Sequence, residues 1–268
     1  MTREHTKASK MQAFGQLLDI LDELREKCPW DKKQTFESLR PLTIEETFEL
    51  NEALLHQDYA EVCKELGDII MHIVFYAKVG EEQQLFDIQD ILEKVCAKLK
   101  FRHPHIYADT TAETASDVER NWEQIKQREK DGNKTVLAGV PDSLPSMIKA
   151  YRMQDKARGV GFDWERKEDA WEKVQEEIAE VQAEMTKAVE DADKSVLEAE
   201  FGDLFFSLIN VARLYKVNPD NALEYSNKKF RNRFNYLEAK AKEDGKSLKD
   251  MSLAEMDEYY NEAKNYYR

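Results

Sequence analysis

Carboxylates recur at helical spacing in two places of this sequence. The first half holds EETFE at 45–49 and ELGD at 65–68, and the second half holds EEIAE at 176–180 and EFGD at 200–203. Residues three or four apart share one face of a helix, so each motif can present its acids on one side. Such acids on facing helices would repel unless a cation neutralised them.

Magnesium is the natural cation for an all-carboxylate site. It prefers oxygen ligands in octahedral geometry and keeps positions for water and substrate phosphates. The motifs therefore predict Mg²⁺ sites, with Mn²⁺ as a possible substitute. The predicted ligands are Glu45, Glu46, Glu49, Glu65 and Asp68 in the first half, and Glu176, Glu177, Glu180, Glu200 and Asp203 in the second.

The alternative is that these acids form solvated helix faces, which is the usual role of a single E-x-x-E pair. Three observations favour the metal site. Each E-x-x-D is embedded in a strongly apolar segment, where an unpaired acid is costly. A glycine, Gly67 or Gly202, precedes each Asp and predicts a close approach of the helices there. The whole pattern also occurs twice.

Basic and aromatic residues follow the acids in both halves. Pairs of cations four residues apart are typical of a grip on polyphosphate, although an ordinary basic helix surface is the competing interpretation. An aromatic residue four positions before a lysine is suited to stacking on a nucleobase, or equally to core packing. The predicted substrate-binding residues are Lys98, Arg102, Trp122 and Lys126, then Lys229, Arg233, Tyr260 and Lys264.

A di-iron carboxylate bundle is a weaker interpretation of the same acids. That site needs Glu-x-x-His on two helices, and no such pair accompanies the motifs. His72 lies four residues after Asp68, but Ser207 occupies the matching position of the second half. We therefore expect a structural role for His72.

The elements that carry these residues are predicted to be helices, and the fold class is all-α. Good helix formers dominate, while nine Gly and six Pro are few for 268 residues. Apolar residues recur at helical spacing in three segments. These are Phe14, Leu17, Leu18, Leu21 and Leu24; Ile69, Ile70, Ile73, Val74 and Ala77; and Leu204, Phe205, Leu208, Ile209 and Ala212.

The length is sufficient for two ordinary domains. The segment 131–145 is rich in Gly and Pro and interrupts the helical pattern. We expect a first helical-bundle domain at 1–130, with residues 1–10 flexible, a linker at 131–147 and a second domain at 148–268. A further break is expected at 158–163.

Charge and composition exclude several classes. A formal net charge of -14 argues against nonspecific binding to nucleic acid. No apolar run of 18 residues and no hydrophobic leader is present, so a cytoplasmic protein with no membrane contact is expected. Cys28, Cys63 and Cys96 are widely spaced, and neither a disulfide framework nor a zinc site is predicted.

With these motifs assembled, the sequence resembles the MazG family of nucleoside triphosphate pyrophosphohydrolases. The resemblance rests on CPWDKKQTFESL, LTIEETFEL, KELGDII and RHPHIY in the first half, and on GFDW, EEIAE, EFGDLFFSLINVARL and NKKFRNRF in the second. It implies tandem all-α domains, usually a homodimer, and cleavage of nucleoside triphosphates to monophosphate and pyrophosphate. The ten acids would bind Mg²⁺. Tyr260 stands where the family pattern has Trp, which leaves the base preference open.

Three functional hypotheses follow. In the first, Glu177, Glu180, Glu200 and Asp203 are catalytic, holding metal and activating water for hydrolysis, in nucleotide-pool housekeeping or stress. In the second, the chain is a nucleotide-sensing or interaction module without turnover. In the third, it is a structural scaffold that Mg²⁺ does not stabilise.

Overall fold

A computed structural model describes residues 5–108, 114, 125, 135–191 and 194–267 of the protein. All regular structure within these residues is helical, which confirms the predicted all-α class. The chain divides into two compact units, Met1–Thr111 and Ala112–Arg268. None of the helices in the described ranges is long and apolar enough to cross a membrane.

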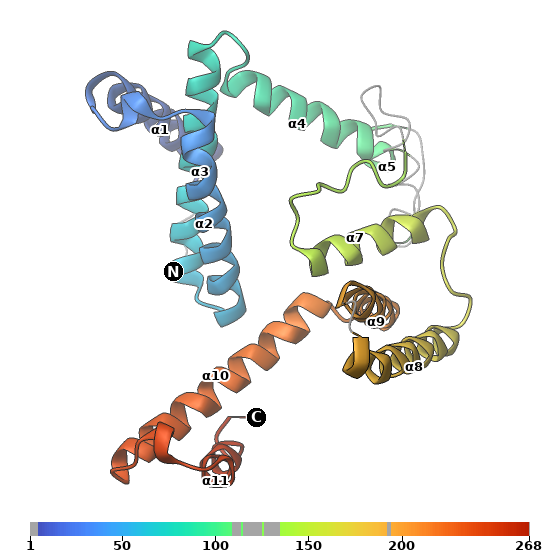
Figure 1. Ribbon diagram of the computed structural model, residues 1–268. Coiled ribbons are helices and arrows are strands. Elements are labelled where there is room, and N and C mark those ends of the chain that lie inside the picture. The colour runs from blue at the N-terminus through green and yellow to red at the C-terminus, as the bar shows by residue number, and fades with distance from the viewer. Residues whose placement is uncertain (1–4, 109–113, 115–124, 126–134, 192–193, 268) are drawn as a thin grey trace. The chain divides into compact units, whose positions relative to one another are not determined.

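The first unit is built around a long helical hairpin. Helices α2 and α3 pack along each other, and α1 packs against α3 (Figure 1). The elements are α1 (Lys7–Lys27), the 3-10 helix η1 (Asp31–Lys33), α2 (Phe36–His56), α3 (Tyr59–Glu82), α4 (Ile88–Arg102) and α5 (Pro104–Tyr107).

A two-residue turn folds α2 back onto α3. Gln57 ends α2 in the left-handed conformation, with φ of 56°. The Asp58 side chain then accepts hydrogen bonds from the backbone N–H groups of Ala60 and Glu61, which starts α3. Glu49 lies about two helical turns before the Gln57–Asp58 connection, and Glu65 lies about two helical turns after it. The hairpin therefore aligns the two acid motifs.

The core of the first unit combines residues of the predicted apolar patterns with others that were not predicted. Leu21, Leu39, Val74, Phe75 and Val79 are buried together. Leu21 belongs to α1 and Val74 to α3, so each predicted pattern contributes to the core, whereas Leu24, Ile70 and Ile73 of the same patterns are exposed.

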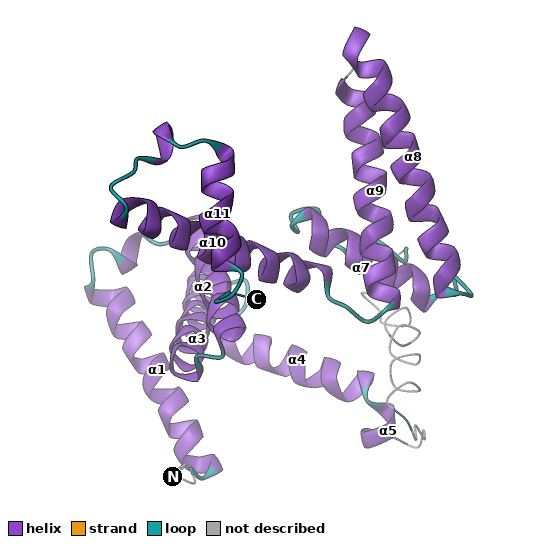
Figure 2. Cartoon of the chain, turned by 90° about the horizontal axis from the view of Figure 1, so that it is seen from below, coloured by secondary structure: helices purple, strands orange, loops and turns teal. Residues whose placement is uncertain are grey.

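The second unit repeats the hairpin with α8 and α9, which run side by side over most of their length (Figure 2). Ala170, Val174 and Val211 form its buried centre. The elements are α7 (Ser146–Gly159), α8 (Lys167–Asp191), α9 (Lys194–Leu214), α10 (Pro219–Glu243), the 3-10 helix η2 (Leu248–Asp250) and α11 (Leu253–Ala263).

The predicted break at 158–163 lies between α7 and α8. Helix α7 ends at Gly159, and Gly161 adopts φ of +88°, a conformation that side chains rarely take. The chain then continues through Trp164 to the start of α8. This loop forms one wall of the pocket described below.

Candidate active site

Carboxylates from facing helices meet in both units. In the first unit they are Glu46 and Glu49 from α2 with Glu65 from α3. In the second they are Glu177 and Glu180 from α8 with Glu200 from α9. Within each trio, one oxygen per residue lies within 4.8 Å of the others. These trios, called here the first and second acid clusters, occupy matching positions of the repeated motifs.

The other four predicted ligands lie outside the clusters. Glu45 and Glu176 are exposed. Asp68 is half-buried and its charge contributes to the raised pKa of Glu46. Asp203 is exposed and lines the pocket of the second unit. The ligand role of all ten acids stays a prediction.

Burial makes the first cluster electrostatically strained. Burial raises the pKa of the Glu46 carboxyl, and the charges of Asp68, Glu49 and Glu65 raise it further. Glu65 is 2% exposed. One of its oxygens accepts a hydrogen bond from Lys64 Nζ at 2.8 Å, which lowers the pKa of Glu65. Its other oxygen, Oε2, is buried and has no partner among the described residues.

The carboxylates of the second cluster also repel one another. Glu177 is 4% exposed, and Lys173 Nζ lies 2.8 Å from its Oε1. A hydrogen bond with Glu177 raises the pKa of Glu180, and burial and the charge of Glu177 add to the effect. The repulsion among the three carboxylates is therefore only partly offset by Lys173.

The donor set of both clusters fits a hard divalent cation. Each offers only carboxylate oxygens, drawn from two helices and close enough to share one ion. An ion would also supply the partner that Glu65 Oε2 lacks. The clusters can therefore hold a metal ion.

The lysine that balances each cluster was not predicted from the sequence, and it comes from a different helix in each unit. Lys64 belongs to α3, whereas Lys173 belongs to α8, the counterpart of α2. The position of the second half that matches Lys64 holds Ala199, and the position of the first half that matches Lys173 holds Leu42. The sequence spacing could have predicted the second lysine, because Lys173 lies four residues before Glu177 and therefore on the same helix face.

The expectation that Gly67 and Gly202 permit close helix approach is wrong. A Cβ built on either glycine would have no described atom of a neighbouring element within 4 Å. The helix surface beside Asp68 and Asp203 is therefore open space within each unit.

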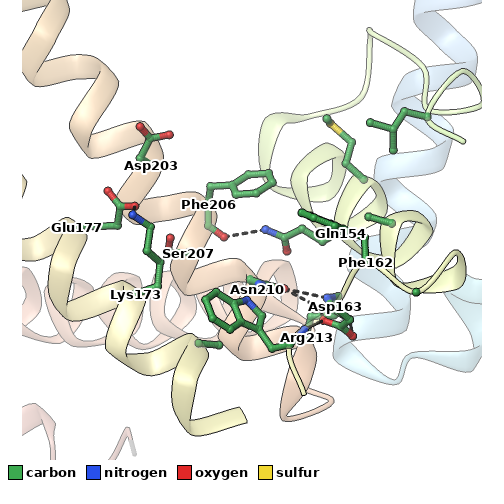
Figure 3. Close-up of a pocket in the computed structure, with 16 residues that line it drawn as sticks. Gln154, Phe162, Asp163, Lys173, Glu177, Asp203, Phe206, Ser207, Asn210 and Arg213 are labelled. Carbon is green, nitrogen blue, oxygen red and sulfur yellow. Dashed lines mark hydrogen bonds and ion pairs between the residues drawn. The ribbon is translucent and has the colours of Figure 1, made fainter. Parts of the chain in front are cut away.

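A pocket of about 680 Å³ adjoins the second acid cluster (Figure 3). Its walls come from α7, the 161–164 loop, α8 and α9, together with Leu137. Glu177 belongs both to the cluster and to the pocket wall, and Lys173 and Asp203 stand at the same end. The volume lies within the range of small-molecule sites.

A bidentate ion pair holds the loop against α9 at the opposite end of the pocket. Arg213 Nη1 donates to Asp163 Oδ2 at 3.1 Å, and Nη2 donates to Oδ1. Burial by itself would raise the pKa of Asp163, but the hydrogen bonds from Arg213 and from the Trp164 backbone N–H outweigh it and lower that pKa. This pair fixes the loop that carries Phe162 and Trp164.

Comparison with known proteins explains the duplicated clusters. The MazG nucleotide pyrophosphohydrolase domain model matches the chain twice, over residues 34–107 and 168–237, and each match encloses one acid cluster. The chain belongs to the MazG family. The predicted resemblance is therefore confirmed, as is the tandem arrangement of two MazG domains.

Several relatives share most of this chain. The nucleoside triphosphate pyrophosphohydrolase of Escherichia coli K12 is 39% identical over 259 residues, covering 95% of this chain and 98% of the relative. Nucleoside triphosphate pyrophosphohydrolase/pyrophosphatase MazG of Thermotoga maritima is 38% identical over 254 residues, covering 94% and 95%.

Two further similarities differ in coverage. Uncharacterized protein YabN of Bacillus subtilis is 45% identical over 254 residues, which cover 94% of this chain but 51% of the relative, so the chain spans about half of that protein. The crystal structure of a mazG-related protein from Thermotoga maritima covers 42% of this chain and 99% of its own, with a TM-score of 0.39 and 28% identity.

The residues predicted to bind substrate in the second half lie on α10, on α11 and at the C-terminal end of α11. The Arg233 guanidinium lies 5.9 Å and Lys264 Nζ 6.0 Å from the centre of the Tyr260 ring. Arg233 Nε also donates to the Tyr267 carbonyl at 2.9 Å. Lys229 lies on α10, and none of the four belongs to the pocket wall.

The corresponding residues of the first MazG domain are only partly described. Lys98 and Arg102 lie one turn apart on α4, and Lys64 of α3 contacts the first acid cluster. Trp122 and Lys126 lie outside the described residues. Their substrate-binding roles stay predictions.

His72 forms part of a polar network in the first unit. The Thr43 hydroxyl hydrogen-bonds the Leu39 carbonyl, the Tyr76 hydroxyl at 2.8 Å and His72 Nδ1 at 3.0 Å. Burial lowers the pKa of His72, although the charge of Asp68 opposes this. The network links α2 to α3 directly beside the first acid cluster.

Proposed function

We propose that the chain hydrolyses nucleoside triphosphates to nucleoside monophosphate and pyrophosphate, using Mg²⁺ held by Glu177, Glu180 and Glu200. The observation that carries this proposal is the shared position of Glu177, which is both a member of the second acid cluster and a wall of the pocket. Phosphates at the cluster would leave the rest of the nucleotide in the pocket. The names of the Escherichia coli and Thermotoga maritima relatives support the same reaction.

The proposed reaction divides among the residues of this site. When bound, Mg²⁺ supplies charge neutralisation and lowers the pKa of water. The Lys173 side chain is partly exposed at the pocket end. Lys173 would therefore break its contact with Glu177 and contact the triphosphate instead. Asp203 lines the pocket outside the cluster and would accept the proton from water. Water attacks the α-phosphorus, the bond to the β-phosphate bridging oxygen breaks, and pyrophosphate leaves.

We further propose a homodimer that maintains cytoplasmic nucleotide pools. A large apolar side chain on α9 supports a partner surface, because Phe205 is 57% exposed and does not line the pocket. The net charge of -14 supports a free nucleotide, carried with its metal, over nucleic acid as the ligand. Light scattering would contradict the dimer if it gave the mass of a single chain.

The test compares hydrolysis by two matched variants. Glu180→Gln should lower kcat by at least about 100-fold, because it removes one cluster oxygen that carries charge. Glu49→Gln makes the equivalent change in the first unit and should leave kcat within about threefold. Chromatography of a panel of ordinary and modified triphosphates would identify the products.

Three results would contradict the proposal. Release of orthophosphate with a diphosphate would place the cleavage at another bond. Binding of nucleotide without monophosphate formation would favour the nucleotide-sensing alternative. Equal loss of activity in Glu49→Gln and Glu180→Gln would overturn the assignment of catalysis to the second unit.

A further inference from the structure

Asn210 lines the pocket of the second unit from one face of α9. The residues that α9 contributes to the pocket wall recur three or four positions apart and therefore share a helix face. They are Asp203, Phe206, Ser207, Asn210 and Arg213. Asn210 lies about 10 Å further along the helix than Asp203. Its polar side chain thus stands in the wall away from the second acid cluster (Figure 3).

The orientation of the Asn210 amide is fixed by Arg213. Arg213 Nε donates to Asn210 Oδ1 at 3.1 Å, and Arg213 Nη2 donates to the same oxygen at 2.8 Å. Because a guanidinium only donates, the amide oxygen must face it and the amide nitrogen must face the other way. Arg213 is itself paired with Asp163. The fold therefore determines that the free side of this amide is a donor.

This donor is accessible and forms no bond within the protein. Asn210 is half-buried, and its Nδ2 has no hydrogen-bond partner in the described part of the chain. The side-chain nitrogen and oxygen atoms there that are both buried and unpartnered are Glu65 Oε2 and Gln154 Oε1, so Asn210 Nδ2 retains accessible surface. Since Asn210 shares its helix face with the rest of the α9 wall, a ligand in the pocket can reach this N–H group.

The first unit has a different side chain at the matching position. The repeated motifs align Asn210 with Phe75 and Arg213 with Lys78. Phe75 is 4% exposed and belongs to the core of the first unit, while Lys78 Nζ lies 2.7 Å from Asp22 Oδ1. The amide donor and the guanidinium that orients it therefore belong to the unit to which we assign hydrolysis.

We infer that Asn210 Nδ2 contacts the nucleobase and selects bases that present a carbonyl oxygen over bases that present an amino group. The inference rests on the proposed function, in which the phosphates lie at the second acid cluster and the nucleoside extends into the pocket. A carbonyl oxygen accepts from Nδ2, whereas an amino group would place two donors against each other. Asn210 is thus a specificity-determining residue.

The experiment compares bases that differ at one edge. UTP and CTP carry a carbonyl and an amino group at the same ring position, and ITP and ATP differ in the same way. In the unmodified protein, kcat/KM should be at least about tenfold higher for UTP than for CTP, and for ITP than for ATP. In Asn210→Leu, which has no donor, both ratios should fall to about twofold or less.

Asn210→Asp reverses the chemistry of the contact. Its carboxylate can keep both hydrogen bonds from Arg213, while the donor that faces the pocket becomes an acceptor. Both ratios should fall below about one, because the amino groups of CTP and ATP now have a partner. Repulsion between the new charge and the triphosphate is common to all four substrates and cancels in the ratios.

Asn218 provides a matched control. Its Oδ1 accepts from the Asn221 backbone N–H at 3.0 Å at the start of α10, and it lies outside the pocket wall. Asp caps a helix about as well as Asn, so Asn218→Asp adds the same charge with little change in stability. Both ratios should stay as they are in the unmodified protein. Circular dichroism checks the folding of each variant, and Asn210→Leu decides if Asn210→Asp does not fold.

Each outcome decides between the two levels of inference. Ratios that fall in Asn210→Leu and invert in Asn210→Asp, but not in Asn218→Asp, support base selection by Nδ2. Ratios near one in the unmodified protein, or unchanged ratios in active Asn210 variants, overturn this inference and leave the proposed hydrolysis intact. Absence of nucleoside triphosphate hydrolysis by the unmodified protein overturns both.

Discussion

Lys173 Nζ lies 2.8 Å from Glu177 Oε1, one helical turn further along α8. The same lysine lies 3.0 Å from Glu176 Oε1 and also lines the pocket. Hydrogen bonds to both acids raise the pKa of Lys173, so it stays charged at neutral pH. This geometry places one cation between the second acid cluster and the site where a triphosphate would enter.

Lys173→Met should lower kcat/KM for triphosphate about tenfold to 100-fold, because the substrate loses a charged hydrogen-bond donor. Most of the change should be in KM if Lys173 contacts the ground-state triphosphate. Lys173→Arg should retain more activity. Steady-state kinetics at saturating Mg²⁺ measures the effect.

The control for Lys173 is Lys240, which forms an exposed ion pair with Glu243 on α10 at 2.8 Å. Lys240→Met makes the same chemical change outside the site and should alter kcat/KM by less than about twofold. Equal effects of the two substitutions would refute a specific role for Lys173.

Magnesium should stabilise the protein through the acid clusters. At 100 times its Kd, a ligand that binds only the folded state adds about 2.7 kcal/mol, which corresponds to roughly 5 to 10 °C in Tm. Without Mg²⁺, Glu180→Gln should be no less stable than the unmodified protein, because it relieves repulsion from Glu177 and Glu200. Its gain on adding Mg²⁺ should be smaller.

Calorimetric melts with and without Mg²⁺ test this prediction. Glu243→Gln is the matched control, since Glu243 lies on α10 and outside both clusters. A Mg²⁺-independent Tm in the unmodified protein would instead support the structural-scaffold hypothesis.

The ion pair of Asp163 and Arg213 should make the second unit sensitive to acid. The folded-state pKa of Asp163 is lowered, so its stabilising contribution is present above the unfolded value of about 4 and is lost as pH falls through the folded value. Asp163→Asn should reduce the free energy of unfolding by about 3 kcal/mol at pH 7. The difference should shrink below about pH 4.

Urea denaturation of both proteins at pH 7 and at pH 3 measures this effect. Lys27→Gln is a useful comparison, because its partner Glu23 lies on the same helix and the pair is exposed. A difference between Asp163→Asn and the unmodified protein that stayed constant with pH would mean that the carboxylate charge is not responsible.

Two glycine substitutions should have opposite effects on stability. Gly202→Ala should stabilise the protein by up to about 1 kcal/mol, because helix propensity rises and no described atom of a neighbouring element lies within 4 Å of the new Cβ. Gly80→Ala should destabilise it by about 1–3 kcal/mol, since its Cβ would lie 2.7 Å from the Phe86 carbonyl oxygen. Thermal unfolding distinguishes them, and a loss of stability in Gly202→Ala would contradict the open surface beside Asp203.

The acid motifs were predictable because their chemistry is local. Glu177 and Glu180 share a helix face by spacing alone, and repetition of the motif indicated the partner helix of Glu200. The helical class followed in the same way from residues such as Leu21 and Val74, which recur at helical spacing and form the core.

The pocket was not predictable from spacing. Gln154 and Phe206 meet across 52 positions of sequence, and their hydrogen bond joins a side chain to a backbone carbonyl. Because every residue has a backbone carbonyl, the residue type at position 206 does not indicate this bond. The role of Gly202 was also predicted wrongly. A glycine in a helix is compatible with a close neighbouring helix and equally with open space, and the sequence does not distinguish the two.

The two balancing lysines, on α3 in one half and on α8 in the other, allow the halves to diverge. Both halves keep three converging acids. A substitution of Lys173 on α8 changes the positive charge beside the second acid cluster, and the matching position of the first half holds no lysine that would be changed in the same way. A duplicated enzyme can in this way adjust the ion affinity of one copy while the other keeps its own, and an inhibitor built around Lys173 would discriminate between them.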